Sequence, residues 1–415
     1  MNKKTILEKA SPSESSKKTL AAYILILISV LTVSAQNNSA VIVFQHANVI
    51  DGISREPMRD VSVVVANGKI AAIGKRIKAP SNAQIIDLGG KWLLPGYIDA
   101  HVHVNFKQAQ RALRSGVTTI RQMSGGDDIE IREAHKKGRT DLPEVLASGA
   151  QIRPDMASSA NFVKIFPELS DMKGSPVSGV ENVRRVVKAL VSRGVDHIKV
   201  LATERAGTPG TDPRKRTFTD EELAAIVDEA RRAGLKVAAH AHADDGAYAA
   251  VKAGVRSIEH GTWMTDKTLR LMKSRGTWYD PTILYWETHQ PSDPILVERA
   301  RTMRPLVEEV TRKAYKMGIP IVGGTDFNYD DGQLTIADNA AILAELGLTK
   351  MEAIKAITSQ SAKLLEIDHR TGAIRKGLEA DILIFGSDPL SSLKALKDIR
   401  MIVNDGHVVF NNLDQ

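Results

Sequence analysis

The sequence has no cysteine among its 415 residues. This absence excludes disulfide bonds, thiolate-ligated zinc and a cysteine nucleophile, so any bound metal must rely on nitrogen and oxygen ligands. It says nothing about the cellular compartment, because exported proteins need not contain disulfides. A Gly-x-Gly-x-x-Gly motif is also missing after the apolar run 92–98, which removes the usual support for a nucleotide-binding open sheet.

Residues 1–35 have the pattern of a cleavable export signal. Lys17 and Lys18 precede an apolar stretch of 14 residues, 20–33, and the small pair Ser34-Ala35 follows it. The stretch is short for a membrane span, whereas the basic residues before it and the small residues after it are typical of a signal peptide. We predict cleavage after Ala35 and an exported protein, periplasmic or secreted, without membrane attachment after cleavage. An uncleaved anchor is the alternative, because the segment before Lys17 is long for a signal.

Charge and size narrow the class of protein further. Without residues 1–35, which carry five lysines and two glutamates, the formal net charge falls from +7 to +4. The basic cluster 214–216 has no interleaved aromatic residues, so we interpret it as a solvated loop and expect no nucleic-acid partner. The chain is longer than the roughly 250 residues of one barrel, so a second small domain is expected.

Short β-rich runs lie near both ends of the remaining chain. Within residues 36–94, Asn67-Gly68 separates two such runs and predicts a tight hairpin. Within residues 366–415, Asn404-Asp405-Gly406 separates two more. Because these segments flank everything else, we predict that they assemble one small β-sandwich domain.

Strand and helix patterns alternate across residues 95–365 and predict an α/β fold, a (β/α)8 TIM-like barrel. Helix-like segments such as 180–193, 220–233 and 244–253 separate most of the apolar runs. Thr219 with Glu222 is a capping-box pattern. Eight units favour a closed parallel barrel over a doubly wound open sheet. The runs expected as strands are 92–98, 117–123, 143–148, 195–202, 236–241, 255–259, 278–284 and 319–323.

Side chains that can bind a metal follow several of these runs. His101 and His103 have the i, i+2 spacing that places both imidazoles on one face of a strand. In a barrel, functional groups gather at the carboxyl ends of the strands, so distant residues converge. Five of the eleven histidines have such positions, which favours a metal site. The candidate residues are His101, His103, Lys199, His240, His242, His260 and Asp326.

Each candidate also has an ordinary structural explanation when it is considered alone. The histidines could be hydrogen-bonded core or loop residues, and Asp326 could be a helix N-cap. Lys199 is harder to explain, because a lysine among apolar neighbours is costly unless it is neutral, paired or modified. The set as a whole favours the metal site.

These residues resemble the motifs of the amidohydrolase superfamily of metal-dependent hydrolases. Within it the chain is most similar to the binuclear Xaa-Pro dipeptidase-like and carboxypeptidase-like branch, through segment 146–149, Lys199 and the His-Ala-His of 240–242. The resemblance covers nearly the whole chain after residue 35. The segments that carry it are 95–103, 115–119, 198–200, 239–242, 258–261, 324–326 and 377–382.

The resemblance implies two divalent metal ions, which in this family are usually zinc. An N6-carboxylated Lys199 would bridge them, because a carbamate turns an expensive buried cation into an anionic ligand. With an unmodified lysine, the site would hold one metal. The implied ligands are His101, His103 and Asp326 for the more buried ion, and His240 and His260 for the second.

The resemblance also implies the reaction. A metal-activated hydroxide would attack an amide carbon, and Asp326 would take the proton and deliver it to the leaving amine. His242 would contact the substrate's carbonyl or carboxylate. We therefore predict a hydrolase that cleaves the C–N bond of a small-molecule amide, a dipeptide or an N-acyl amino acid.

The substrate's side chains cannot be named from the sequence. The loop 203–210 is rich in glycine and proline and belongs at the barrel mouth, where specificity loops lie. Arg205 in this loop could clamp a substrate carboxylate or be a solvated arginine. Tyr285 and Trp286 could line an apolar subsite or pack in the core.

Two other functions stay open. The first is a cyclic-amide hydrolase resembling imidazolonepropionases, against which Lys199 counts. The second is a non-catalytic metal-dependent binding protein, against which Asp326 counts. The sequence leaves the oligomeric state open, a homo-oligomer included.

Overall fold

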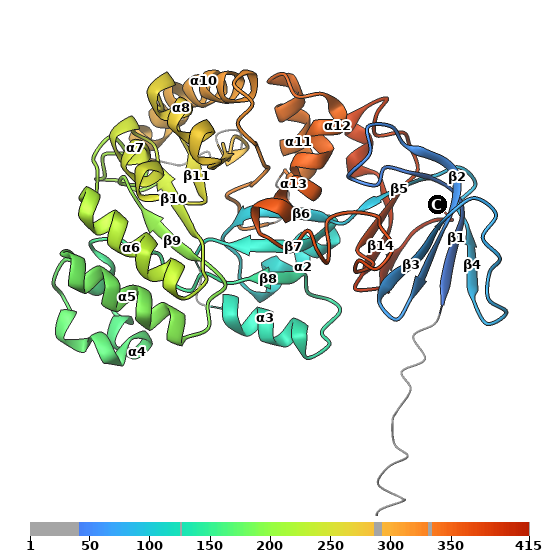
Figure 1. Cartoon of the computed structure of the whole chain (residues 1–415), viewed down its shortest axis with the longest axis horizontal. Coiled ribbons are helices and arrows are strands. Elements are labelled where there is room, and N and C mark those ends of the chain that lie inside the picture. The colour runs from blue at the N-terminus through green and yellow to red at the C-terminus, as the bar shows by residue number, and fades with distance from the viewer. Residues whose placement is uncertain (1–40, 125–126, 286–292, 331–333, 415) are drawn as a thin grey trace, which may run out of the picture. The chain divides into compact units, whose positions relative to one another are not determined.

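The computed structural model describes residues 41–124, 127–285, 293–330 and 334–414 (Figure 1). The predicted signal segment and Trp286 lie outside these residues. Within the described ranges, no helix combines the length and hydropathy needed to cross a membrane.

Strands from both ends of the described chain form one mixed sheet. Its order is β15-β14-β13-β5-β1-β2-β3, and β4 pairs with β1 in parallel. The described strands form this single sheet around one apolar cluster, so the predicted two-layer sandwich is not confirmed. The strands are β1 (Ile42–Val49), β2 (Met58–Ala66), β3 (Lys69–Gly74), β4 (Gln84–Asp87), β5 (Trp92–Pro95), β13 (Ile382–Phe385), β14 (Ile399–Asn404) and β15 (His407–Asn411).

Two turns in this sheet have the conformation that their residues predict. Asn67 and Gly68 join β2 to β3 with φ values of 52° and 73°. Asp405 and Gly406 join β14 to β15 with φ values of 50° and 79°. Two successive left-handed residues are what a two-residue hairpin needs to match the twist of its strands. The predicted hairpin at Asn67-Gly68 is therefore confirmed.

Parallel strands form two further sheets, with the orders β6-β7-β8 and β12-β11-β10-β9. Every residue of β9, β10 and β11 is buried, as expected where both faces of a parallel sheet are covered. The strands are β6 (Tyr97–Val102), β7 (Val117–Gln122), β8 (Glu144–Leu146), β9 (Ile198–Leu201), β10 (Val237–Ala241), β11 (Ser257–His260) and β12 (Trp278–Asp280).

No ladder joins the two parallel sheets among the described strands, and isolated bridges link an edge strand of one sheet to residues outside the strands. Ile152 bridges to Val200 of β9, and Ile321 bridges to Tyr279 of β12. The described strands therefore do not form the predicted closed barrel as one sheet. What the structure shows is a mixed α/β fold.

The segment 319–323, expected as the eighth strand, forms only one of these bridges. Pro320 has no amide hydrogen to donate, and glycines follow at 323 and 324, which weakens strand pairing. The segment still reaches β6, because the Ala100 amide donates to the Gly323 carbonyl over 3.1 Å.

The run 92–98, expected as one strand, is divided between two sheets. β5 ends at Pro95 in the mixed sheet and β6 begins at Tyr97 in a parallel one. Gly96 lies between them, and a Cβ atom there would overlap the side chain of Thr118. The absence of a side chain thus allows the chain to pass close to β7 as it changes sheets.

The helices agree closely with the sequence pattern. The capping box of Thr219 and Glu222 is confirmed at the start of α6, and in Figure 1 helices α5 to α8 lie beside β9 to β11. The helices are α2 (Phe106–Arg114), α3 (Asp128–Lys136), α4 (Phe162–Ile165), α5 (Val180–Ser192), α6 (Asp220–Arg232), α7 (Asp244–Ala253), α8 (Asp266–Arg275), α10 (Pro294–Lys316), α11 (Ile336–Glu345), α12 (Lys350–Ala356) and α13 (Ser359–Leu364).

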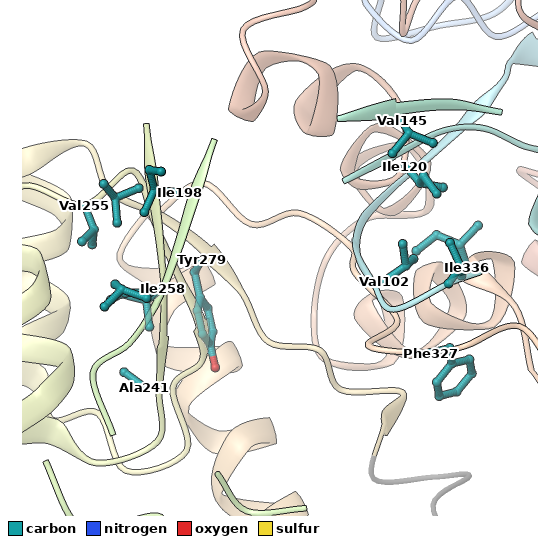
Figure 2. Close-up of a cluster of buried hydrophobic side chains, with 14 of the residues drawn as sticks. Val102, Ile120, Val145, Ile198, Ala241, Val255, Ile258, Tyr279, Phe327 and Ile336 are labelled. Atoms are coloured by element: carbon teal, nitrogen blue, oxygen red, sulfur yellow. The ribbon is translucent and has the colours of Figure 1, made fainter. Parts of the chain in front are cut away.

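One apolar cluster extends through both parallel sheets and their helices. Figure 2 shows members of it on strands of each sheet, Ile198 and Ile258 in one and Val102 and Ile120 in the other. This packing sets the strands side by side, and the ends of the strands carry the polar residues described below.

A buried carboxyl in the mixed sheet makes stability depend on pH. Asp381 accepts a hydrogen bond from the Thr371 hydroxyl (2.6 Å) and another from the Asp405 amide (3.0 Å). Two effects raise the pKa of Asp381 from 3.8 to about 7: burial, which is the larger, and repulsion from the Asp405 carboxylate. Between these values the folded protein holds a proton that the unfolded chain releases, so stability falls as pH rises through this window.

Asp381→Asn should therefore stabilise the protein at pH 8, by on the order of 1–3 kcal/mol, and have a smaller effect at pH 4. Thermal unfolding of chelator-treated protein at both pH values measures this. The exposed Asp60→Asn is the control and should behave like the unsubstituted protein. A variant that is less stable at pH 8 would contradict the assignment.

Candidate metal centre

A cavity of about 420 Å³ lies at the carboxyl ends of β6, β9, β10 and β11. Arg205 and Tyr285 of the predicted substrate loops line it. The structure also brings together all seven residues of the predicted site, which line the same cavity: His101, His103, Lys199, His240, His242, His260 and Asp326.

Asp326 lies between the two histidines of the His-x-His segment. One oxygen of its carboxylate is 3.3 Å from His101 Nε2 and 3.0 Å from His103 Nε2. Burial alone would raise the pKa of Asp326, but these two histidines hold it well below its usual value. The carboxylate is therefore ionised and can accept a proton or bind a cation.

The backbone at Asp326 is held in an unusual conformation. Its φ is 59°, a left-handed value that costs energy outside glycine. Asp99 of β6 fixes the preceding residue, because its carboxylate accepts from the Thr325 amide (3.0 Å) and hydroxyl (2.7 Å). The Tyr329 hydroxyl donates to the same carboxylate over 2.6 Å. These bonds from β6 place the Asp326 side chain opposite His101.

Three further histidines form a cluster of neutral imidazoles. His240, His242 and His260 each offer a nitrogen, and these atoms lie within 4.8 Å of one another. Burial is the main cause that holds the pKa of His240 and His260 well below the usual value and lowers that of His242 to about 3. A neutral imidazole has a free lone pair, which is the form that binds metals.

Hydrogen bonds orient these rings. His260 Nδ1 is 2.7 Å from the Thr282 hydroxyl, and His242 Nδ1 is 2.8 Å from the Thr262 hydroxyl. His240 uses Nε2 instead, which lies 3.3 Å from a backbone carbonyl. All three rings line the cavity.

Lys199 lies beneath this cluster with its amine buried and, among the described residues, without a hydrogen-bond partner. Burial lowers the pKa of Lys199 to about 8, so a neutral amine is accessible near physiological pH. An orphaned buried amine beside neutral imidazoles and a carboxylate fits a site for a divalent cation and a modified lysine. The nitrogen and oxygen donors suit zinc and similar ions.

The sequence reasoning missed the residues behind His101. Its Nδ1 lies 3.0 Å from a carboxylate oxygen of Glu259 on β11, and both side chains are buried. Arg121 of β7 donates to both oxygens of Glu259 at 3.0 and 3.1 Å. Arg121 also donates to the Ser257 hydroxyl over 3.1 Å. The signal in the sequence was two charged residues inside apolar runs, Arg121 after Ile120 and Glu259 after Ile258.

Comparison with known proteins shows to which protein family the chain belongs. A model of the amidohydrolase family matches residues 92–409. The chain belongs to the amidohydrolase family. Ochratoxinase from Aspergillus niger is 26% identical over 425 residues, covering 90% of this chain and 87% of that protein.

Other similarities agree with this family. A crystal structure of a Xaa-Pro dipeptidase with bound methionine is similar at a TM-score of 0.79 and 27% identity, covering 90% of this chain and 100% of that one. An imidazolonepropionase from Shewanella woodyi is 22% identical over 400 residues, 84% of this chain and 93% of that protein. This amidohydrolase is therefore an enzyme, a hydrolase that acts on carbon–nitrogen bonds, as predicted.

Glu259 should strengthen metal binding indirectly, by orienting His101. An acceptor at Nδ1 fixes the ring and raises its basicity, and removing such a partner costs about 10- to 100-fold in metal affinity. We expect that loss for Glu259→Gln in a zinc titration against a competing chelator. Ser257→Ala removes a neighbour of the carboxylate but keeps the bond to His101, so its affinity should change little.

Thermal unfolding without metal separates this effect from a loss of folding, since Glu259→Gln leaves Arg121 without its counter-charge. A folded variant with the zinc affinity of the unsubstituted enzyme would contradict a role for Glu259 in positioning His101.

Proposed function

We propose that this enzyme is an exported amidohydrolase that uses divalent metal to cleave the amide bond of a dipeptide or an N-acyl amino acid. The observation that carries the proposal is the buried amine of Lys199, which has no hydrogen-bond partner among the described residues and lines the same cavity as three neutral imidazoles. Such an amine has no structural use of its own, whereas carboxylation would make it an anionic ligand between two cations.

The donors form two groups that share His260, and this number of donors supports a pair of ions. His101 and His103 meet at Asp326, and His240 approaches His260 with ring centroids 4.4 Å apart. A carboxylated Lys199 would join the groups. Divalent ions such as zinc would supply a hydroxide at neutral pH and polarise the scissile carbonyl.

The chain's own residues would manage the proton and the substrate. Asp326 is ionised and lines the cavity, so it is placed to accept a proton from the attacking water and to pass it to the leaving nitrogen. His242 is neutral, and its Nδ1 lies 2.8 Å from the Thr262 hydroxyl. Because His242 lines the cavity, it is placed to contact a substrate oxygen.

We further propose that the parallel strands follow a (β/α)8 plan. Ile152, which follows β8, bridges to β9, and the segment 319–323 bridges to β12 and accepts a hydrogen bond from the Ala100 amide of β6. A plan of this kind supports the proposed site, because catalytic groups of such folds gather at the carboxyl ends of the strands.

The choice of linear amides is supported by the similarity to a Xaa-Pro dipeptidase. The similarity to an imidazolonepropionase makes a cyclic amide the second candidate. The buried Lys199 favours the linear amide, because a carboxylated lysine would supply the ligand that bridges a second metal ion to the first.

Zinc-loaded enzyme should release free amino acids from a library of dipeptides and N-acyl amino acids. Asp326→Asn keeps the shape of the side chain but cannot accept a proton, so turnover should fall about 10³-fold or more. The exposed Asp368→Asn is the matched control and should retain full turnover. Absence of turnover on every linear amide, together with hydrolysis of cyclic amides, would overturn the proposal.

A further inference from the structure

The loop after β9 is held in place over the cavity by an arginine of α10. Arg299 donates to the carbonyl of Ala206 over 2.9 Å and to that of Thr208 over 3.2 Å. The same side chain binds Thr211, whose hydroxyl in turn donates to the Arg205 carbonyl. The backbone on both sides of Arg205 is thus anchored, and its side chain lines the cavity.

Arg205 has no ion-pair partner among the residues that the structure describes. Its guanidinium is half-buried. Burial, and then repulsion from Arg153, lower the pKa of Arg205. The nearby Asp155 opposes this shift only in part, and its carboxylate is paired with Arg153. A cation that is partly withdrawn from water and repelled by its neighbour is costly unless a ligand compensates it.

The anionic group of the cavity is already engaged elsewhere. Asp326 faces His101 and His103, so the cavity has an anionic side at the histidines and, at Arg205, a cation that forms no ion pair with any described residue. A guanidinium presents paired N–H groups in a planar fork that matches a carboxylate. The missing partner is therefore an anion on the substrate.

We propose that Arg205 binds a free carboxylate of the substrate and restricts the enzyme to amides of amino acids with an unblocked carboxyl end. This inference rests on the proposed function, because it assigns one end of the substrate whose amide bond lies at the metal centre. Dipeptides and N-acyl amino acids have that carboxylate, whereas their carboxamides lack it.

The test compares kcat/KM for a panel of N-acetyl-L-amino acids with that for the matching carboxamides. The unsubstituted enzyme should prefer the free acids, and Arg205→Met should lose about 10- to 100-fold on the acids but retain its rate on the carboxamides. Arg205→Lys keeps the positive charge but lacks the planar guanidinium, so its kcat/KM on the free acids should fall less than that of Arg205→Met. The exposed Arg231→Met is the control and should match the unsubstituted enzyme on both series.

Two results would overturn the inference while leaving the proposed function intact: equal rates on acids and carboxamides in the unsubstituted enzyme, or an unchanged ratio in Arg205→Met. If no linear amide is hydrolysed, the proposed function fails. The carboxylate site at Arg205 is then tested by ligand binding alone. Calorimetry with free L-amino acids and their amides should then show weaker binding of the acids to Arg205→Met. Equal binding to both proteins would contradict a carboxylate site.

Discussion

The buried contact between Glu259 and His101 is the interaction on which the candidate metal centre depends. Arg121 on β7 neutralises Glu259 on β11, and Glu259 in turn orients His101 on β6. His101 then presents its other nitrogen to Asp326. Charges alternate along this series, so each buried group has a partner that offsets its desolvation. The series also joins strands of both parallel sheets, which links the geometry of the site to the packing of the fold.

The identity of the site could be predicted from the sequence because its residues follow continuous apolar runs. Such runs mark strands that are buried on both faces. A histidine or lysine at the end of such a run either lines a functional site or is buried at an energetic cost. Lys199 shows this most clearly, since its amine is buried and has no partner among the described residues. The helices were also predictable where local signals exist, as at Thr219, whose side chain and that of Glu222 cap each other's backbone.

The pairing of strands could not be predicted to the same degree. Alternation and hydrophobicity report whether a residue is buried, but not which strand it pairs with. The run 92–98 therefore looked like one strand although Gly96 divides it between two sheets, and segment 319–323 looked like a strand although it forms a single bridge. Glu259 and Arg121 were missed for a related reason, because their partners lie on other strands and no local spacing connects them.

The proposed function depends on Lys199 being a metal ligand rather than a buried cation. Metal analysis of the unsubstituted enzyme and of Lys199→Met, both reconstituted with zinc and bicarbonate, distinguishes the two. We expect about two ions per chain in the unsubstituted enzyme and one or fewer in Lys199→Met, with both proteins folded. Equal metal content in the two proteins would show that Lys199 is not a metal ligand.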